Sequence, residues 1–130
     1  MATTTSFPGP ITAITIFAED LPATKAFYTD ALALPVHYED DASAVFNFGN
    51  TLINVLAVDE APSLVAPAKV AGPDAGSRMQ FTLTVDDVDA TCAMLADRGV
   101  TLLNGPIDRP WGIRTASFTD PAGHIWEIAS

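Results

Sequence analysis

Residues 120–128 read Asp-Pro-Ala-Gly-His-Ile-Trp-Glu-Ile, and they follow an alternating stretch at residues 113–119. The Asp-Pro pair and Gly123 predict a tight turn between two strands. The period of two puts His124, Trp126 and Ile128 on one face of the closing strand and Ile125, Glu127 and Ala129 on the other. Because an unpaired buried carboxylate is costly, we expect Glu127 to face a cavity or a polar partner.

The same order of elements occurs twice along the chain. Residues 11–18 alternate as a strand, Asp20 caps a helix that runs to about residue 32, and strands are predicted at 36–39, 44–48 and 51–58. Residues 78–86 form another strand, Asp87 caps a helix that Gly99 ends, and strands follow at 101–104, 113–119 and 124–129. The sequence predicts two β-α-β-β-β modules, 11–58 and 78–129, joined by a linker at 59–77 that is rich in proline, alanine and glycine.

The two modules align at a fixed offset of 67 residues (87 − 20), which indicates an internal duplication. At this offset Ile14 and Ile16 match Phe81 and Leu83, an apolar set that predicts the face covered by the helix. The other face holds Ala13, Thr15 and Phe17, which match Gln80, Thr82 and Thr84. We expect this more polar face to line a cavity.

Length and composition describe one soluble globular domain. The 130 residues are 48% hydrophobic and 17% charged, and no apolar run reaches the length of a membrane span. The net charge of −10 disfavours nucleic acid as a partner. Residues 1–10 lack the basic and apolar parts of a secretion signal and are read as a short leader, and Cys92 is the only cysteine. A cytoplasmic location is expected.

Five short motifs stand in a fixed order along the chain: Glu19-Asp20-Leu21, Phe27-Tyr28, Asp86-Asp87-Val88, Pro110-Trp111-Gly112-x-Arg114 and Asp120-Pro121-x-Gly123-x-x-x-Glu127. In this order and with the duplication, the chain resembles the vicinal oxygen chelate superfamily. That superfamily includes glyoxalase I, bleomycin and fosfomycin resistance proteins and extradiol dioxygenases. The resemblance implies an α+β fold in which two tandem βαβββ modules form a curved mixed sheet around a cup-shaped cavity, with the helices on the outer face. It also implies a homodimer.

Metal-dependent members of the superfamily draw their ligands from the first and last strands of each module. The resemblance places these positions at Ala13, Asn54, Gln80 and Glu127. Ala13 cannot coordinate an ion, amide oxygens are weak donors, and only Glu127 is a strong ligand. We therefore expect no metal and no other cofactor, with a divalent metal as the alternative.

The register of Asn54 decides whether its side chain belongs to the cup. With Leu52, Asn54 and Leu56 facing the cup, the β-branched residues Ile53 and Val55 face the helix. The opposite register buries Asn54 under the helix without an evident partner. We prefer the first register.

Several residues have a structural interpretation beside the functional one. Glu127 is a ligand-binding residue or general base, or it accepts hydrogen bonds from Arg114 or Arg109. Trp111 walls a ligand site or seals a dimer interface, and Arg114 holds an anionic ligand or pairs with an acidic side chain. Four other residues are expected to be structural or at the surface: His37, Cys92, His124 and Trp126.

These observations favour a metal-free protein that sequesters a small cationic or aromatic molecule, as bleomycin resistance proteins do. Glu127 is the candidate catalytic residue, and the predicted ligand-binding set is Ala13, Phe17, Asn54, Gln80, Thr82, Trp111, Arg114 and Glu127. The competing hypothesis is an enzyme, a glyoxalase-like lyase or isomerase or a dioxygenase. It would use a metal held by Gln80, Glu127 and waters or by a partner chain, or Glu127 alone as a base. A third is a subunit that only dimerises or docks onto a larger enzyme.

Overall fold

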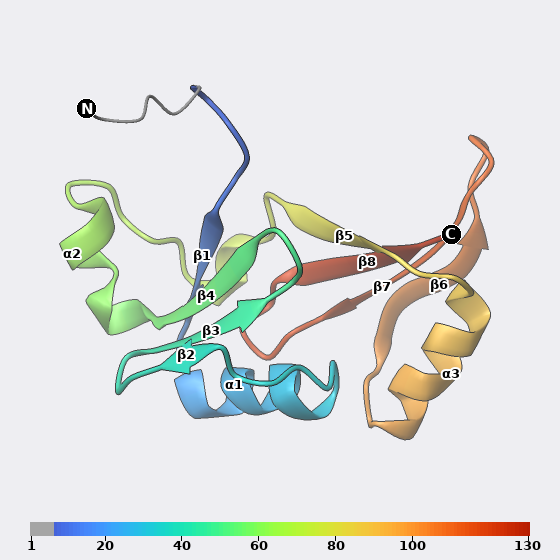
Figure 1. Cartoon of the computed structure of the whole chain (residues 1–130), viewed down its shortest axis with the longest axis horizontal. Helices are drawn as coiled ribbons and strands as arrows, with labels where there is room; N and C mark the ends of the chain where they lie inside the picture. The colour runs from blue at the N-terminus through green and yellow to red at the C-terminus, as the bar shows by residue number, and fades with distance from the viewer. Residues whose placement is uncertain (1–6) are drawn as a thin grey trace, which may run out of the picture.

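The computed structural model describes residues 7–130, so residues 1–6 of the predicted leader lie outside the described part. The first module comprises β1 (Ala13–Ala18), α1 (Leu21–Asp30), β2 (Tyr38–Glu39), β3 (Ser43–Asn47) and β4 (Leu52–Ala57). The second comprises β5 (Gln80–Thr84), α3 (Val88–Asp97), β6 (Leu102–Asp108), β7 (Arg114–Thr119) and β8 (Ile125–Ala129) (Figure 1). This order confirms the α+β fold with two β-α-β-β-β units.

Both long helices begin at the predicted aspartates. Asp20 Oδ1 accepts a hydrogen bond from the Ala23 amide at 3.0 Å, and Asp87 Oδ1 accepts one from the Ala90 amide at 3.0 Å. Each cap satisfies an amide that the first helical turn leaves without a partner. Gly99, at a φ of 82°, ends α3 as expected because a left-handed backbone is least costly for glycine.

Hydrogen bonds within the described residues form two four-stranded sheets, in the orders β1-β4-β3-β2 and β5-β8-β7-β6, where the sequence predicted one curved sheet. The pairing inside each sheet is mixed, as predicted: β1 runs parallel to β4 and β5 to β8, whereas the hairpin neighbours are antiparallel. Helix α1 contacts β3 and β4, and α3 contacts β6 and β7. Each helix therefore covers its own sheet.

Three segments differ from the sequence-based expectation. Strand β2 has only two residues. Strand β6 continues to Asp108, beyond the predicted end at residue 104, because shifts in its pairing register between Leu102 and Ile107 accommodate Gly105 and Pro106. This Gly-Pro pair interrupts the sequence pattern of a strand, so the longer strand was not predicted. The linker contains three short helical segments, η1 (Val58–Glu60), α2 (Pro62–Val65) and η2 (Pro73–Ala75). Proline is compatible with a first helical turn, so a proline-rich linker can hold such turns.

One core joins the helix-covered faces of both sheets. Aromatic pairs cross between the modules, with ring centroids 6.0 Å apart for Phe27 and Phe118 and 6.0 Å for Tyr28 and Trp126. Arg98 Nη1 donates to the Ala31 carbonyl at 2.8 Å, so the two helix ends are linked as well. The largest fully buried side chains include those of Trp126, Tyr28, Phe46, Phe118 and Leu95. The modules are therefore packed as one unit.

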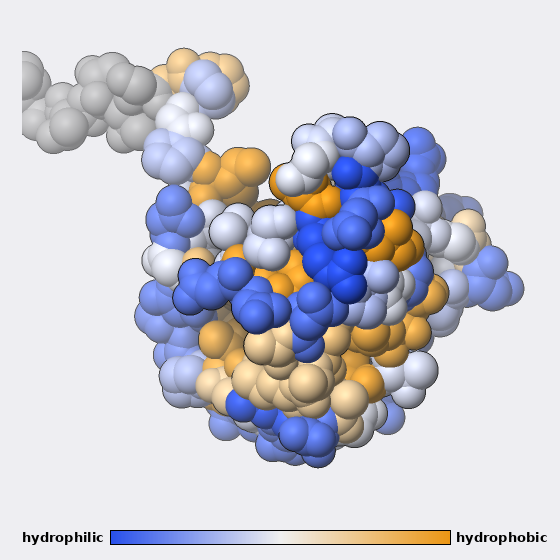
Figure 2. Space-filling model, turned by 90° about the vertical axis from the view of Figure 1, so that its right-hand side faces the viewer, coloured by the Kyte–Doolittle hydropathy of each residue, from blue (hydrophilic) through white to orange (hydrophobic). Residues whose placement is uncertain are grey.

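The surface that carries α3 is mixed in polarity (Figure 2). Val88, Cys92 and Leu95 of this helix are buried, whereas Asp89, Ala90 and Ala93 between them are exposed. Within residues 7–130, no helix is long and apolar enough to cross a membrane.

Candidate functional site

Glu127 lies on the sheet face that points away from the core. Its neighbours Trp126 and Ile128 are 2% and 1% exposed and belong to the core, so the alternation of β8 turns the Glu127 side chain to the opposite face. Thr82 is its register partner on β5, and Thr82 Oγ1 donates to Glu127 Oε1 at 2.9 Å. The alternative in which Glu127 accepts from an arginine is wrong, because its partner in the structure is a threonine.

Asn54 occupies the matching place in the first module. Its register partner is Thr15, and Asn54 Nδ2 lies 3.3 Å from Thr15 Oγ1. Ile53 and Val55 are buried in the core, which confirms the register with Asn54 on the other face. Asn54 Oδ1 is buried and has no hydrogen-bond partner among the described residues. A buried acceptor without a partner is uncommon in folded proteins, so Asn54 is a candidate functional residue.

Gln80 and Ala13 begin β5 and β1, and both are exposed. Gln80 shares a face with Thr82 because the two are separated by one residue of a strand. In the single chain the predicted cup is therefore an open sheet face at these positions. Phe17 is half-buried and lines a separate cavity beside the linker.

The residues at the superfamily's metal positions do not fit a metal ion. Ala13 has no donor atom, Asn54 and Gln80 offer amides, and Glu127 is the one carboxylate. Among residues 7–130, no group of three or more His, Cys, Asp or Glu side chains is arranged to hold an ion.

Arg114 is oriented away from the Glu127 face. Arg114 shares one face of β7 with the core residues Ala116 and Phe118, so its side chain points to the helix side. There it pairs with Asp89 of α3 at 3.0 Å and with Asp108 at 2.9 Å, and the hydrogen bonds to Asp89 and then Asp108 raise the pKa of the guanidinium. The structure corrects the placement of Arg114 in the ligand set and supports its ion-pair interpretation.

Two further residues of the predicted set have different surroundings. Trp111 is 69% exposed in the turn between β6 and β7. Its two predicted roles, as a wall of a ligand site or as part of a dimer interface, stay predictions. Arg109 Nε donates to Thr115 Oγ1 at 2.8 Å, so this arginine is also engaged away from Glu127. The set expected to be structural or at the surface includes Trp126 and Cys92, which are buried, and His37, which is exposed.

Sequence reasoning missed the polar neighbours of Glu127 on β7. Ser117 lies directly opposite Glu127 in the antiparallel pair, so the two side chains share a face. Ser117 is 5% exposed and donates to Asn104 Oδ1 at 2.7 Å. The alternation of Ala116, Ser117 and Phe118 would have placed Ser117 on this face.

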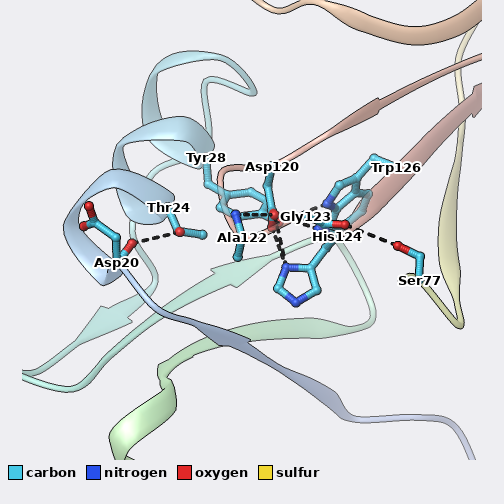
Figure 3. Close-up of polar contacts among 9 residues, drawn as sticks. All are labelled: Asp20, Thr24, Tyr28, Ser77, Asp120, Ala122, Gly123, His124 and Trp126. Atoms are coloured by element: carbon cyan, nitrogen blue, oxygen red, sulfur yellow. Dashed lines mark hydrogen bonds and ion pairs between the residues drawn. The ribbon is translucent and has the colours of Figure 1, made fainter. Parts of the chain in front are cut away.

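Asp120 is the centre of a buried polar cluster that the sequence did not reveal (Figure 3). It accepts from the Tyr28 hydroxyl at 2.6 Å, and His124 Nδ1 lies 2.8 Å from Asp120 Oδ2. Trp126 Nε1 donates to the same hydroxyl at 2.9 Å. Burial, and then the charge of Asp120, raise the pKa of the Tyr28 phenol, so Tyr28 stays a neutral donor at physiological pH. The cluster ties α1 to the last hairpin.

The duplicated modules and the polar face define the chain as a βαβββ protein of the glyoxalase type. The model of the Glyoxalase/Bleomycin resistance protein/Dioxygenase superfamily matches residues 11–128, and the chain belongs to this family. The expected vicinal oxygen chelate fold is thereby confirmed.

Relatives agree with this assignment. The uncharacterized protein YraH of Bacillus subtilis (strain 168) is 32% identical over 119 residues, which cover 88% of this chain and 93% of that protein. A crystal structure of a glyoxalase/bleomycin resistance protein/dioxygenase from Nocardioides matches with a TM-score of 0.83 and 25% identity, over 97% of this chain and 85% of that chain. Lactoylglutathione lyase from Agrobacterium tumefaciens matches with a TM-score of 0.76 and 21% identity, over 95% of each chain, which shows a shared fold.

Proposed function

We propose that the protein binds a small molecule on the sheet face around Glu127, without a metal ion, and sequesters it. The observation that carries this proposal is the donor set at the superfamily's metal positions, where Glu127 is the one carboxylate and is bonded to Thr82. A weak donor set favours direct contact between the carboxylate and a ligand over chelation of an ion. No reaction step is required of Glu127 in this proposal.

The character of the face indicates the character of the ligand. Glu127 supplies a carboxylate, and Asn54 supplies a buried acceptor without a partner among the described residues. The carboxylate favours a ligand that donates hydrogen bonds or carries positive charge, and the net charge of −10 attracts cations over a longer range. The ligand is therefore expected to be cationic. The alternative is an aromatic ligand, which would gain affinity by contact with Trp111.

Calorimetric titration with a panel of cationic glycopeptide and aromatic antibiotics tests this proposal. Glu127→Gln removes the charge and keeps the shape, so a cationic ligand should bind about tenfold more weakly. Glu60→Gln, which removes an exposed charge in η1, is the matched control and should leave the affinity unchanged. No heat with any member of the panel contradicts sequestration.

The enzyme hypothesis is tested on the same two proteins. Elemental analysis of the purified wild type should show no stoichiometric Zn, Ni, Mn or Fe. One equivalent of such a metal that disappears in Glu127→Gln would overturn the metal-free proposal in favour of a lyase, isomerase or dioxygenase.

A homodimer is part of the proposal. Strand β6 and the turn that follows it expose four large apolar side chains, Leu103, Ile107, Trp111 and Ile113, at 54%, 36%, 69% and 36%. Exposed apolar side chains gathered in one region are typical of an interface. Sedimentation equilibrium should give a dimer, and Trp111→Ser should weaken it; a monomer at every concentration contradicts this part.

A further inference from the structure

A cavity of about 410 Å³ lies where the linker passes the end of β1 and the start of β5. Its walls come from Phe17 and Glu19, from parts of the segment 65–79, and from the turn at Ala122, Gly123 and His124. Of the residues that the sequence predicted to bind a ligand in the cup, only Phe17 lines this cavity. The cavity is therefore a second candidate site, separate from the one around Glu127, Thr82 and Gln80.

His124 is held in one orientation at this cavity. Its Nδ1 lies 2.8 Å from Oδ2 and 3.1 Å from Oδ1 of Asp120, and the Asp120 side chain is 0% exposed. Asp120 is itself fixed by Tyr28 and by the backbone amides of Ala122 and His124. A carboxylate beside Nδ1 makes that nitrogen the donor, so Nε2, which points away from Asp120 in Figure 3, is left for another group.

The Lys and Arg side chains that have no partner in the described part of the chain also lie at this cavity. The chain has six Lys and Arg residues against sixteen Asp and Glu residues. Four of the six have partners: Lys25 with Glu39, Arg98 with the Ala31 carbonyl, Arg109 with Thr115, and Arg114 with Asp89 and Asp108. The other two, Lys69 and Arg78, have no hydrogen-bond or ion-pair partner among residues 7–130, and both line this cavity.

The rest of the lining is mostly apolar. Phe17, Val70 and Met79 provide hydrophobic surface, and Glu19 is the one acidic residue of the lining. Two cations and an oriented histidine against one carboxylate give the cavity a polarity opposite to that of the whole protein. A volume of this size suits a small organic ligand.

We propose that this cavity binds a small amphipathic monocarboxylate. Arg78 and Lys69 hold the carboxylate, because guanidinium and ammonium groups form strong charge-assisted hydrogen bonds with it. His124 Nε2 bonds a polar group of the ligand, and the apolar body lies against Phe17, Val70 and Met79. The predicted ligand of the Glu127 face is cationic, so the two sites take ligands of opposite charge.

Three probes with one naphthalene body and different charges test the proposal by calorimetry on the full chain: 2-naphthoate, 2-naphthamide and 2-naphthylmethylamine. In the Glu127→Gln background, which lacks the carboxylate of the other site, the anionic probe should bind at least about tenfold more tightly than the neutral and cationic ones. Arg78→Gln and Lys69→Gln should each reduce naphthoate affinity several-fold, and together about tenfold or more. Both side chains are exposed, so the fold should be retained, which thermal unfolding checks.

Lys25→Gln is the matched control, because it removes a cation that is paired with Glu39 outside this cavity. It should leave naphthoate affinity unchanged. His124→Gln should reduce affinity less than the double variant does, because it removes only one of the three polar contacts. Equal affinity for the three probes, no naphthoate binding at millimolar concentration, or equal losses in Lys25→Gln and Arg78→Gln would each overturn the proposal.

Discussion

The two modules contain the same turn before their last strand and use it differently. Asn47 and Asp120 each lie five residues before the first residue of that strand. Each accepts a hydrogen bond from an amide two residues further on, at 2.8 Å from Gly49 and at 3.0 Å from Ala122. Asn47 is exposed and has no other side-chain partner among residues 7–130, whereas Asp120 is buried and also bonds Tyr28 and His124.

The difference shows how a duplicated motif acquires a new role. Both turns need only a short acceptor that stabilises the local backbone. In the second module the acceptor is a carboxylate, which has enough acceptor positions for a phenol and an imidazole as well. The phenol comes from α1 of the first module, where the second module has Leu95 at the matching position of α3. The asymmetric cluster therefore fastens one module to the other.

Asp120→Ala is the substitution with the largest expected effect. It removes the acceptor of two side chains and two amides in a buried place, and unfolding should become easier by about 4 kcal/mol. Asn47→Ala, the matched change in the first module, should cost about 1 kcal/mol or less, because one exposed bond is lost.

Urea unfolding followed by tryptophan fluorescence gives both values on the same scale. If the two variants lose the same stability, the buried cluster does not fasten the modules. The difference between the turns would then be one of exposure alone.

Gly105 and Gly49 provide a second contrast of the same kind. Both have a positive φ, 91° and 103°, but a Cβ at Gly105 would meet the Ala116 Cα and the Thr115 carbonyl oxygen at 2.6 Å, whereas Gly49 has open space. Gly105→Ala should cost about 3 kcal/mol, from backbone strain and overlap together. Gly49→Ala should cost about 1 kcal/mol from strain alone. Differential scanning calorimetry of both variants checks the ranking, and equal melting temperatures would refute it.

Tyr28→Phe should have a smaller effect, about 2 kcal/mol, because it leaves Trp126 Nε1 and Asp120 each without one partner. Tyr38→Phe is the control, since the hydroxyl of Tyr38 is exposed and its bond to Asp40 is long, at 3.3 Å. It should change stability by less than about 0.5 kcal/mol. Similar losses of stability in the two variants would show that the buried hydroxyl of Tyr28 contributes no more to stability than the exposed one of Tyr38.

The contribution of the Tyr28 hydroxyl to the stability of the fold also depends on pH. Burial and the charge of Asp120 raise the pKa of Tyr28 in the folded state above the unfolded value of about 10. The neutral phenol is therefore favoured by folding, and its contribution is complete below pH 10 and falls as the pH rises further. The stability difference between the wild type and Tyr28→Phe should narrow above about pH 10, which urea titrations at pH 8 and pH 11 measure. A constant difference would contradict the assignment.

The sequence predicted the features that depend on local pattern. The caps at Asp20 and Asp87, the core side of Trp126 and the register of Asn54 follow from spacing and alternation, and the structure confirms them. The same alternation, counted from Phe118, would have turned Arg114 towards α3. Arg114 was wrongly placed in the ligand set because it was judged from its motif, Pro110-Trp111-Gly112-x-Arg114, and not from its position in the strand. The Asp120 cluster was out of reach, because Tyr28 and Asp120 are 92 residues apart and their contact depends on how the modules pack.

Among the variants that are not controls, those of the helix caps have the smallest expected effect, and they give the sharpest test of equivalence between the modules. Each aspartate accepts from an amide at 3.0 Å, and Thr24 and Thr91 repeat a second bond to the backbone carbonyl of the cap residue. Asp20→Ala and Asp87→Ala should therefore each cost about 1 kcal/mol, and the double variant should cost the sum, because distant sites without shared partners are additive. Urea unfolding of the two single variants and the double variant measures this. Two separate transitions in either single variant would mean that one module unfolds before the other, and the shared core around Tyr28 and Trp126 would then be weaker than its burial indicates.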